Sequence, residues 1–290
     1  MTKIAGIVIV YYPDFKKLLF NIGTFVDKIE QLFIIFNSPV SNENINDLNS
    51  RYLNLQFIIN NENIGIAAAL NQTAQKALNL GYEWLLTMDQ DSGFLSVEFF
   101  KAFERNIDQN IAIFSPNPEL SGDAKVENTD TTEEILCAIT SGSLLNLKIW
   151  NKIGGFEEKL FIDEVDNDYC LKAISSGFKI IRFVNIPLVH ELGQNKTVLF
   201  LFKKYTIIIH PPLRNYYIFR NNLYIFSKYK KEFPKFVRSR KIMLLKVFLK
   251  IILFSSERVE NCGFIIRGIK DCYNNSYGPY KGEIQKSVLR

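Results

Sequence analysis

The chain has 290 residues, 47% of them hydrophobic and 22% charged, which is typical of a folded globular protein and excludes a disordered or fibrous one. The formal net charge of +5 favours anionic partners such as phosphates or lipid headgroups without choosing among them. The four cysteines form no C-x-x-C pair, so reduced thiols of a cytosolic protein are expected, not a zinc site or a disulfide framework.

Strands and helices alternate along the first two thirds of the sequence. Short β-branched runs at 4–10, 31–36 and 55–60 indicate strands buried on both faces, and a helix opens after the first of them. An Ala-rich helix is expected over 64–80 and a strand over 82–88. A helix at 94–106, a loop at 116–132, a strand at 138–147, a helix at 163–176 and a strand at 179–189 follow. The alternation predicts an α/β sheet, in which ligands bind outside the carboxyl ends of the strands.

The composition changes near Thr197, beyond which the chain is basic, aromatic and expected to be helical. The sequence thus predicts one domain over residues 1–196 and a helical, membrane-associating region over 197–290. Within 242–254 only Lys246 and Lys250 interrupt an apolar run, as in a helix that lies on an anionic membrane. An ordinary core helix with a solvated edge is the alternative. No uninterrupted apolar window reaches about 20 residues, so no membrane-spanning helix is expected.

The segment "LLTMDQDSG" places two carboxylates, Asp89 and Asp91, directly after a predicted core strand. Burying charge is costly, and a turn at a strand end lets both carboxylates converge on one cation. Carboxylate oxygens are hard ligands that suit Mg²⁺ or Mn²⁺. The pair therefore predicts a metal site, with a solvated turn as the alternative.

Two further features point to the same edge of the sheet. His190 follows the last predicted strand, where its imidazole could complete a Mn²⁺-type site. In "FIDEVDNDYC", Asp163, Glu164 and Asp166 lie near the start of a predicted helix. The helix macrodipole accounts for some of these acids, but one carboxylate could act as a general base toward a bound hydroxyl.

The ordered set of motifs resembles a family 2 glycosyltransferase of the GT-A fold, a Rossmann-like mixed sheet flanked by helices, here with a C-terminal basic and aromatic helical extension. The motifs are "IVIVYYPD", "NENIGIAAALNQ", "LLTMDQDS", "TSGSLLN", "GGFEEKLFIDEVDNDYCLKA" and "VHELG", and they cover roughly residues 1–195. "RNYYIFRNN" adds a resemblance to the bacterial rhamnosyltransferase branch.

The resemblance implies a role for each matching residue. Asp91 would hold the Mg²⁺ or Mn²⁺ that bridges the donor diphosphate, with Asp89 beside it near the ribose and His190 as a late metal ligand. Asp166 would be the base that deprotonates the acceptor hydroxyl. The other matches surround the donor or the acceptor loop: Tyr11, Asn37, Asn63, Gly65, Asn71, Gly142, Ser143, Arg214, Tyr216, Tyr217, Arg220 and Asn221.

The sequence departs from the family pattern at three positions. Phe36 stands where an Asp usually reads the nucleobase, so Asn37 could substitute only in part. Val165 precedes Asp166 where a Glu is common, which leaves Asp163 and Glu164 as rival bases. Lys172 stands where Arg is common. Neither the metal ligands nor the base is removed, so an active enzyme is expected.

The resemblance further implies an inverting transfer of L-rhamnose from dTDP-L-rhamnose to a polyprenyl-linked saccharide. The enzyme would be cytoplasmic and peripheral, on an anionic inner membrane surface. The alternatives are a UDP-sugar donor (galactose, glucose or galactofuranose), a non-catalytic membrane-associated relative and a D-x-D phosphatase. The last is disfavoured because its acids would follow the first strand. Nucleic acid is not an expected partner, since long aliphatic residues interleave the basic ones.

Overall fold

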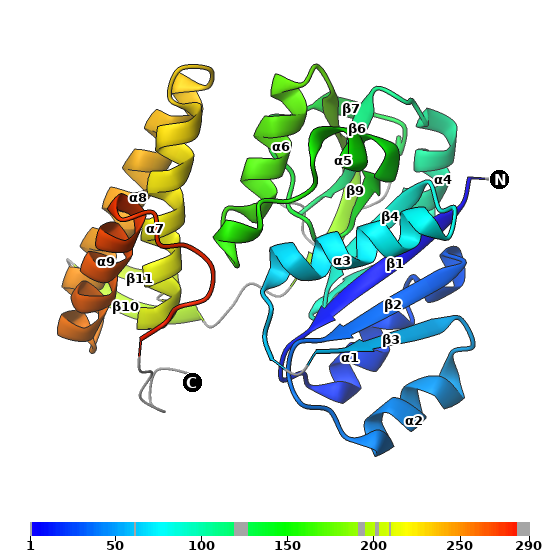
Figure 1. Ribbon diagram of the computed structural model, residues 1–290, viewed down its shortest axis with the longest axis horizontal. Coiled ribbons are helices and arrows are strands. Elements are labelled where there is room, and N and C mark those ends of the chain that lie inside the picture. The colour runs from blue at the N-terminus through cyan, green and yellow to red at the C-terminus, as the bar shows by residue number, and fades with distance from the viewer. Residues whose placement is uncertain are drawn as a thin grey trace. The chain divides into compact units, whose positions relative to one another are not determined.

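The computed structural model describes residues 2–60, 62–118, 127–190, 195–200, 203–208 and 210–282, and for 190, 195–200 and 203–208 it describes the backbone alone. The chain divides into two compact units (Figure 1). Unit 1 comprises Met1–Glu158 and Val165–Glu191, and unit 2 comprises Lys159–Glu164 and Leu192–Arg290. The predicted domain boundary, after residue 196, falls inside a strand of unit 2, and the short segment 159–164 belongs to unit 2 although unit 1 flanks it on both sides.

The described strands of unit 1 form a nine-stranded mixed sheet in the order β3-β2-β1-β4-β8-β6-β9-β5, with β7 paired to β9. Neighbours β3-β2-β1-β4 are parallel, whereas β8 is antiparallel to both β4 and β6. This sheet is the mixed sheet that the sequence predicted. The strands are β1 (Ile4–Val10), β2 (Gln31–Phe36), β3 (Leu55–Ile59), β4 (Trp84–Asp89), β5 (Ser92–Phe94), β6 (Ile111–Asn117), β7 (Thr132–Glu134), β8 (Ser143–Asn146) and β9 (Lys179–His190).

Helices cover both faces of this sheet, which is why its central strands are apolar on both sides. The helices are α1 (Phe15–Ile22), α2 (Asn42–Arg51), α3 (Ile66–Asn79), α4 (Glu98–Asn106), α5 (Leu147–Ile153) and α6 (Val165–Ser175). Capping residues set several boundaries. The Asp14 side chain accepts the first amides of α1, and Gly154, with a φ of 88°, ends α5 in the left-handed conformation.

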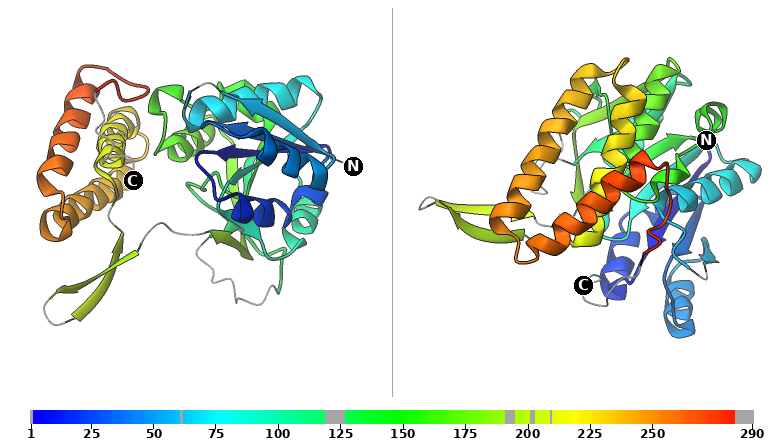
Figure 2. Two further views of the ribbon diagram at one scale, coloured as in Figure 1. Left: turned by 90° about the horizontal axis from the view of Figure 1, so that it is seen from below. Right: turned by 60° about the vertical axis from the view of Figure 1, so that its left-hand side comes forward.

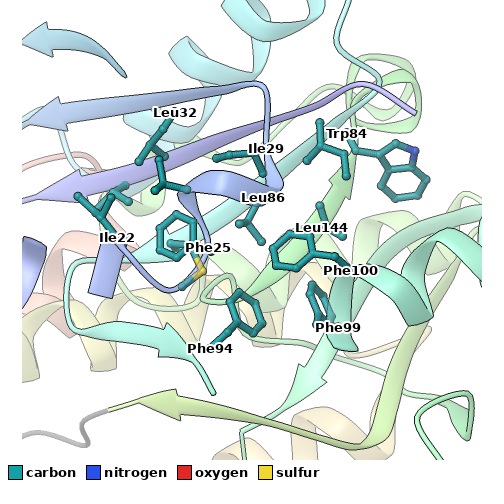
Figure 3. Packing of buried hydrophobic residues seen from close by; sticks show 14 of the residues in the cluster. Ile22, Phe25, Ile29, Leu32, Trp84, Leu86, Phe94, Phe99, Phe100 and Leu144 are labelled. Carbon is teal, nitrogen blue, oxygen red and sulfur yellow. The ribbon is translucent and has the colours of Figure 1, made fainter. Parts of the chain in front are cut away.

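One face of the sheet carries an aromatic core (Figure 3). Phe94 and Phe99 stack with ring centroids 5.0 Å apart, and Phe99 meets Phe183 edge to face at 5.8 Å. Trp84 and Leu86 project from β4 into the same cluster. Burying large rings of this kind contributes most of the favourable free energy of such a core. The sheet that carries the acids at the end of β4 is therefore rigidly supported.

The described residues of unit 2 form three helices and a hairpin (Figure 2). The helices are α7 (Pro212–Tyr229), α8 (Pro234–Phe254) and α9 (Arg258–Tyr273), and α7 packs on both of the others. Gly268 lets α9 approach closely, because a Cβ there would lie 2.5 Å from the carbonyl oxygen of Tyr216. The antiparallel strands β10 (Asn195–Phe200) and β11 (Lys203–Ile208) correct the expectation that the chain is helical from 197 onward. β-Branched and aromatic residues in this stretch favour strands.

Among the described residues, no helix is both long and apolar enough to cross a membrane.

Most predicted elements are confirmed to within a few residues, as for 31–36, 55–60, 64–80 and 179–189. The predicted strand over 138–147 is shorter, because Leu147 already begins α5 after the capping side chain of Asn146. The loop expected over 116–132 contains residues 119–126, which lie outside the described ranges.

Candidate active site

The parallel register brings several chain segments to one edge of the sheet. Ile9 of β1 pairs with Asp89 of β4, and Val10 of β1 pairs with Phe36 of β2. Phe36 in turn pairs with Ile59 of β3. The residues that follow these strands therefore leave the sheet side by side. This is the edge at which open α/β sheets bind ligands.

The last residue of β4 and the turn after it carry the two acids, and the residue between them fixes this segment. Gln90 accepts the amide of Tyr11 at 2.8 Å and donates to the carbonyl of Tyr11 at 3.2 Å. Asn21 donates to the carbonyl of Gln90 at 3.1 Å, and the amide of Asp89 donates to the hydroxyl of Ser141 at 3.2 Å. Asp89 and Asp91 remain partly exposed. Gln90 thus clamps the end of β4 to the end of β1 and leaves a carboxylate on either side of itself.

The backbone of His190 lies beside this turn, because β5 and β9 pair antiparallel with His190 opposite Ser92. His190 therefore lies opposite the residue that follows Asp91 in the chain. Its side chain is outside the described part of the structure. Among the side chains that are described, no three His, Cys, Asp or Glu groups converge on a metal position. The ligand role of His190 stays a prediction.

The loop before β8 reaches the same edge. The amide of Gly142 donates to the carbonyl of Thr87 at 2.8 Å, and Gly142 has a φ of 76°. A Cβ at this position would lie 2.6 Å from Cδ1 of Leu188, so only glycine fits. Ser143 is buried and its hydroxyl donates to the carbonyl of Ile139 at 2.6 Å. These contacts give both predicted residues a role in shaping the loop next to the acids.

Asn37 braces the loop that leads into α3. Its Nδ2 donates to the carbonyl of Gly65 at 3.3 Å, and its Oδ1 accepts from Asn60 at 2.8 Å. Asn63 accepts the amide of Gly65 at 2.9 Å, and Gly65 has a φ of 84°. The buried Asn37 amide is thus already used within the protein, which favours a positioning role over direct reading of a nucleobase.

Asn71 joins α3 to the segment after α5. Its Nδ2 donates to the carbonyl of Phe156 at 2.9 Å and to Glu158 at 2.8 Å, while its Oδ1 accepts from the amide of Phe156 at 2.8 Å and the indole of Trp150 at 3.2 Å. Lys172 on α6 reaches the carbonyl of Gly155 in the same segment. Asn71, predicted to lie on the donor side, therefore connects two segments of unit 1 by hydrogen bonds.

The three candidate bases differ in their surroundings. Glu164 is buried, accepts from Asn222 at 2.9 Å and forms an ion pair with Arg240. Asp163 pairs with Arg214 at 3.2 Å. Asp166 is partly exposed in the first turn of α6, where its carboxylate accepts the amide of Asn167 at 2.8 Å. The helix N-terminus stabilises a carboxylate there. The structure favours Asp166 over Glu164, whose carboxylate is committed to a cation.

The motif RNYYIFRNN, with Arg214, Tyr217 and Arg220, lies on α7 in unit 2. Arg220 is fully buried, and its guanidinium donates to the carbonyls of Leu160 at 3.1 Å and Gly278 at 2.8 Å. The ring of Tyr217 stacks on Phe161 at 5.4 Å, and its hydroxyl accepts the amide of Tyr280 at 2.8 Å. These placements favour an internal role for Arg220 and Tyr217 over contact with a donor. Arg214 is about half exposed beside Asp163.

Burial raises the pKa of Tyr216 on the same helix to about 12, and the hydrogen bond that its hydroxyl donates to Asp271 adds to the shift. Burial lowers the pKa of His210, with help from the neighbouring Arg214. Both groups belong to unit 2, and burial is the main cause of both shifts.

Sequence reasoning missed three of these contributors: Gln90, Asn222 and Arg240. The run Arg220-Asn221-Asn222 carried a usable signal. Three consecutive polar residues, at about 100° per residue, cannot all share the solvated face of a helix.

No family model matches the chain. Over 272 residues it is 24% identical to dTDP-rhamnosyl transferase RfbF of Shigella flexneri, which spans 87% of this chain and 88% of that protein. Its fold is similar to a crystal structure of S. aureus TarS 1-349, with a TM-score of 0.53, 13% identity and coverage of 95% of this chain and 83% of that chain.

The fold also matches GalNAc-T7, crystallised with UDP, GalNAc and Mn²⁺, with a TM-score of 0.53 at 11% identity. That match covers 66% of this chain and 44% of the GalNAc-T7 chain. These neighbours share the GT-A fold, in agreement with the mixed sheet and its acid-bearing edge. The chain therefore has the GT-A fold and is similar in sequence to a dTDP-rhamnosyl transferase.

Proposed function

We propose that the enzyme transfers L-rhamnose from dTDP-L-rhamnose, with inversion, to a lipid-linked saccharide during synthesis of a cell-surface polysaccharide. The observation that supports this donor is the sequence similarity to a dTDP-rhamnosyl transferase, which extends over 87% of the chain. The similarity includes both units and is not confined to the sheet that GT-A enzymes share.

The carboxylate oxygens at the end of β4 are suitable ligands for a divalent cation. Asp89 and Asp91 flank an anchored Gln90 and are partly exposed. Mg²⁺ is commonly held by one or two carboxylates together with substrate phosphates, so a complete cage of protein ligands is not required. In this proposal Asp91 and Asp89 hold Mg²⁺ or Mn²⁺, and His190 adds a ligand. The ion would offset the negative charge that gathers on the leaving diphosphate.

Asp166 is the proposed base. A carboxylate that accepts the proton of the acceptor hydroxyl, on the face opposite the leaving diphosphate, gives displacement with inversion. The partly exposed position of Asp166 lets it meet an acceptor, whereas the buried ion pair keeps Glu164 away from one.

The structure gives no reason to retain a nucleobase-reading role for the second strand. Phe36 is fully buried and stacks on Phe57 at 6.1 Å. Asn37 braces the α3 loop. In this proposal the exposed Tyr11 contacts the base at this edge.

A donor panel tests the proposal. Donor hydrolysis and transfer are measured with Mn²⁺ and equal concentrations of dTDP-rhamnose, UDP-galactose, UDP-glucose or UDP-galactofuranose, and thermal shifts are recorded with dTDP and UDP. Turnover of dTDP-rhamnose and stabilisation by dTDP alone are expected. Turnover restricted to a UDP-sugar would overturn the rhamnose assignment, and no turnover with any donor would favour a non-catalytic relative.

We also propose that the enzyme works at the inner surface of the cell membrane, where a polyprenyl-linked acceptor lies. Along α8 the buried side chains are Val237, Leu244 and Ile251, a narrow stripe with a seven-residue period. Leu245 and Leu249 are 58% and 48% exposed, and Lys246 and Lys250 beside them are exposed too. Exposed apolar residues interleaved with lysines match a helix that binds anionic lipid.

A further inference from the structure

The segment Lys159–Glu164, here called the acidic loop, has an unusual backbone. Phe161, Asp163 and Glu164 have φ values of 66°, 59° and 66°. L-residues rarely adopt the left-handed region, and none of these three is glycine. Such conformations persist only where surrounding contacts hold them, and they cluster at functional sites.

One side chain holds most of this backbone. The amide nitrogen of Asn221 donates to the carbonyls of Leu160 at 2.8 Å, Ile162 at 2.6 Å and Asp163 at 3.1 Å. Asn221 is itself fully buried, and its Oδ1 accepts from Nε of Arg220 at 2.9 Å. The two N–H groups of a single primary amide thus contact three carbonyls within four residues of the loop.

The two residues that flank Asn221 in the chain also donate hydrogen bonds to the acidic loop. Arg220 donates to the carbonyls of Lys159 at 3.3 Å and Leu160 at 3.1 Å. Asn222 donates to Oε1 of Glu164 and accepts from Arg240 at 3.2 Å, so both ends of the loop are bound. Asn222, like Arg220, is fully buried.

The acidic loop ends one residue before α6. Glu164 is followed by the buried Val165 and then by Asp166 in the first turn of the helix. Asp166 thus follows, two peptide bonds on, a loop whose carbonyls and carboxylate are bonded by Arg220, Asn221 and Asn222.

We propose that Arg220, Asn221 and Asn222 are positioning residues for the reaction: they hold the acidic loop in its left-handed conformation and thereby aim the carboxylate of Asp166 at the acceptor hydroxyl. This inference rests on the proposed base role of Asp166. In this proposal these residues of α7 act on the base through the loop.

The test compares two buried asparagines of α7. Asn221→Ala removes the loop contacts, whereas Asn215→Ala removes a buried amide that bonds Asn261 at 2.6 Å and the carbonyl of His210, away from the loop. For Asn221→Ala, kcat should fall by about tenfold to a hundredfold, as expected for a base displaced by about 1 Å, with the donor KM changed by less than about threefold. Asn215→Ala should keep its kcat at matched thermal stability. Equal losses of kcat in the two variants would overturn the proposal.

Hydrogen exchange of residues 159–168 supplies a readout independent of turnover. Asn221→Ala should speed exchange there while the rest of α7 stays protected. Unchanged exchange in the loop would refute the proposal even if the enzyme used another donor or none. If Asn221→Ala does not fold, Asn221→Ser replaces it, since a hydroxyl can donate to one of the three carbonyls. An intermediate kcat is then expected, and a kcat equal to that of the unmodified enzyme would count against the proposal.

Discussion

Replacing Arg240 with methionine isolates the contribution of the buried ion pair in unit 2. Glu164 is 5% exposed, and its carboxylate contacts the guanidinium of Arg240 and the amide of Asn222. Methionine keeps the apolar stem of the arginine and removes its charge. The variant therefore removes the cation that faces this buried carboxylate and keeps the hydrogen bond from Asn222.

Breaking a buried ion pair by removing one partner costs about 3–5 kcal/mol. The Arg240 side chain is 25% exposed, and the hydrogen bond from Asn222 remains. Partial hydration and that bond reduce the expected loss of unfolding free energy to about 2–3 kcal/mol at pH 7.

The loss should depend on pH in a defined direction. In the variant, burial without a cation raises the pKa of Glu164 above the ordinary value of about 4.3 that it has in the unfolded chain. Above the raised value both states are ionised, and the full deficit is present. As the pH falls through it, the folded variant binds a proton before the unfolded chain does, so the deficit shrinks and vanishes below about 4.3.

Urea unfolding at pH 7 and pH 4.5 measures this. Both tryptophans, Trp84 and Trp150, belong to unit 1, so the helical unit 2 is followed by circular dichroism. The double variant Glu164→Gln with Arg240→Met should recover most of the stability, because it removes the buried charge that Arg240 no longer offsets. Equal midpoints for the single variant and the unmodified protein at pH 7, or a deficit that persists undiminished at pH 4.5, would refute the reasoning.

Three further outcomes are expected. Asp91→Asn should abolish the stabilisation of donor binding by Mn²⁺ in calorimetric titrations, while the exposed Asp108→Asn leaves it intact. Because the folded pKa of Tyr216 is raised to about 12, the stability it contributes is complete below pH 10 and is lost between pH 10 and about 12, and Tyr216→Phe should flatten that part of an alkaline unfolding profile. Leu249→Asp should lower co-sedimentation with vesicles containing phosphatidylglycerol at least threefold, whereas Leu53→Asp, at a fully exposed position of unit 1, should not; equal binding by both would count against the membrane proposal.

Strand and helix positions in unit 1 followed from the sequence because burial on both sheet faces leaves uninterrupted apolar runs, as in "IAGIVIV" and "QLFIIF". The hairpin at 195–208 was missed because its short strands are embedded in a basic, aromatic stretch that continues as real helices. Short strands carry little periodicity of their own.

The edge of the sheet could be predicted, but the use of each residue there could not. Parallel register follows from alternating elements and places Asp89 beside the end of β1. Whether an asparagine faces a ligand or its own protein depends on partners far away in sequence. Asn37 bonds Gly65, and Asn71 bonds Phe156, 28 and 85 residues further on. The resemblance in motifs assigned such residues to ligand binding because it reflects which residues occur and in which order. It carries no information about their hydrogen-bond partners.

The same reasoning explains why Arg220, Asn221 and Asn222 are all fully buried although they are consecutive on one helix. Successive side chains point about 100° apart, so three in a row sweep some 200° of the helix surface. One flat neighbour could cover two of them at most. The acidic loop bonds all three, Arg240 of α8 also donates to Asn222, and the carbonyl of Gly278, which follows α9, accepts from Arg220. A loop that is bonded by three successive residues of a helix is held at several points, which is the condition that a left-handed backbone before Asp166 requires.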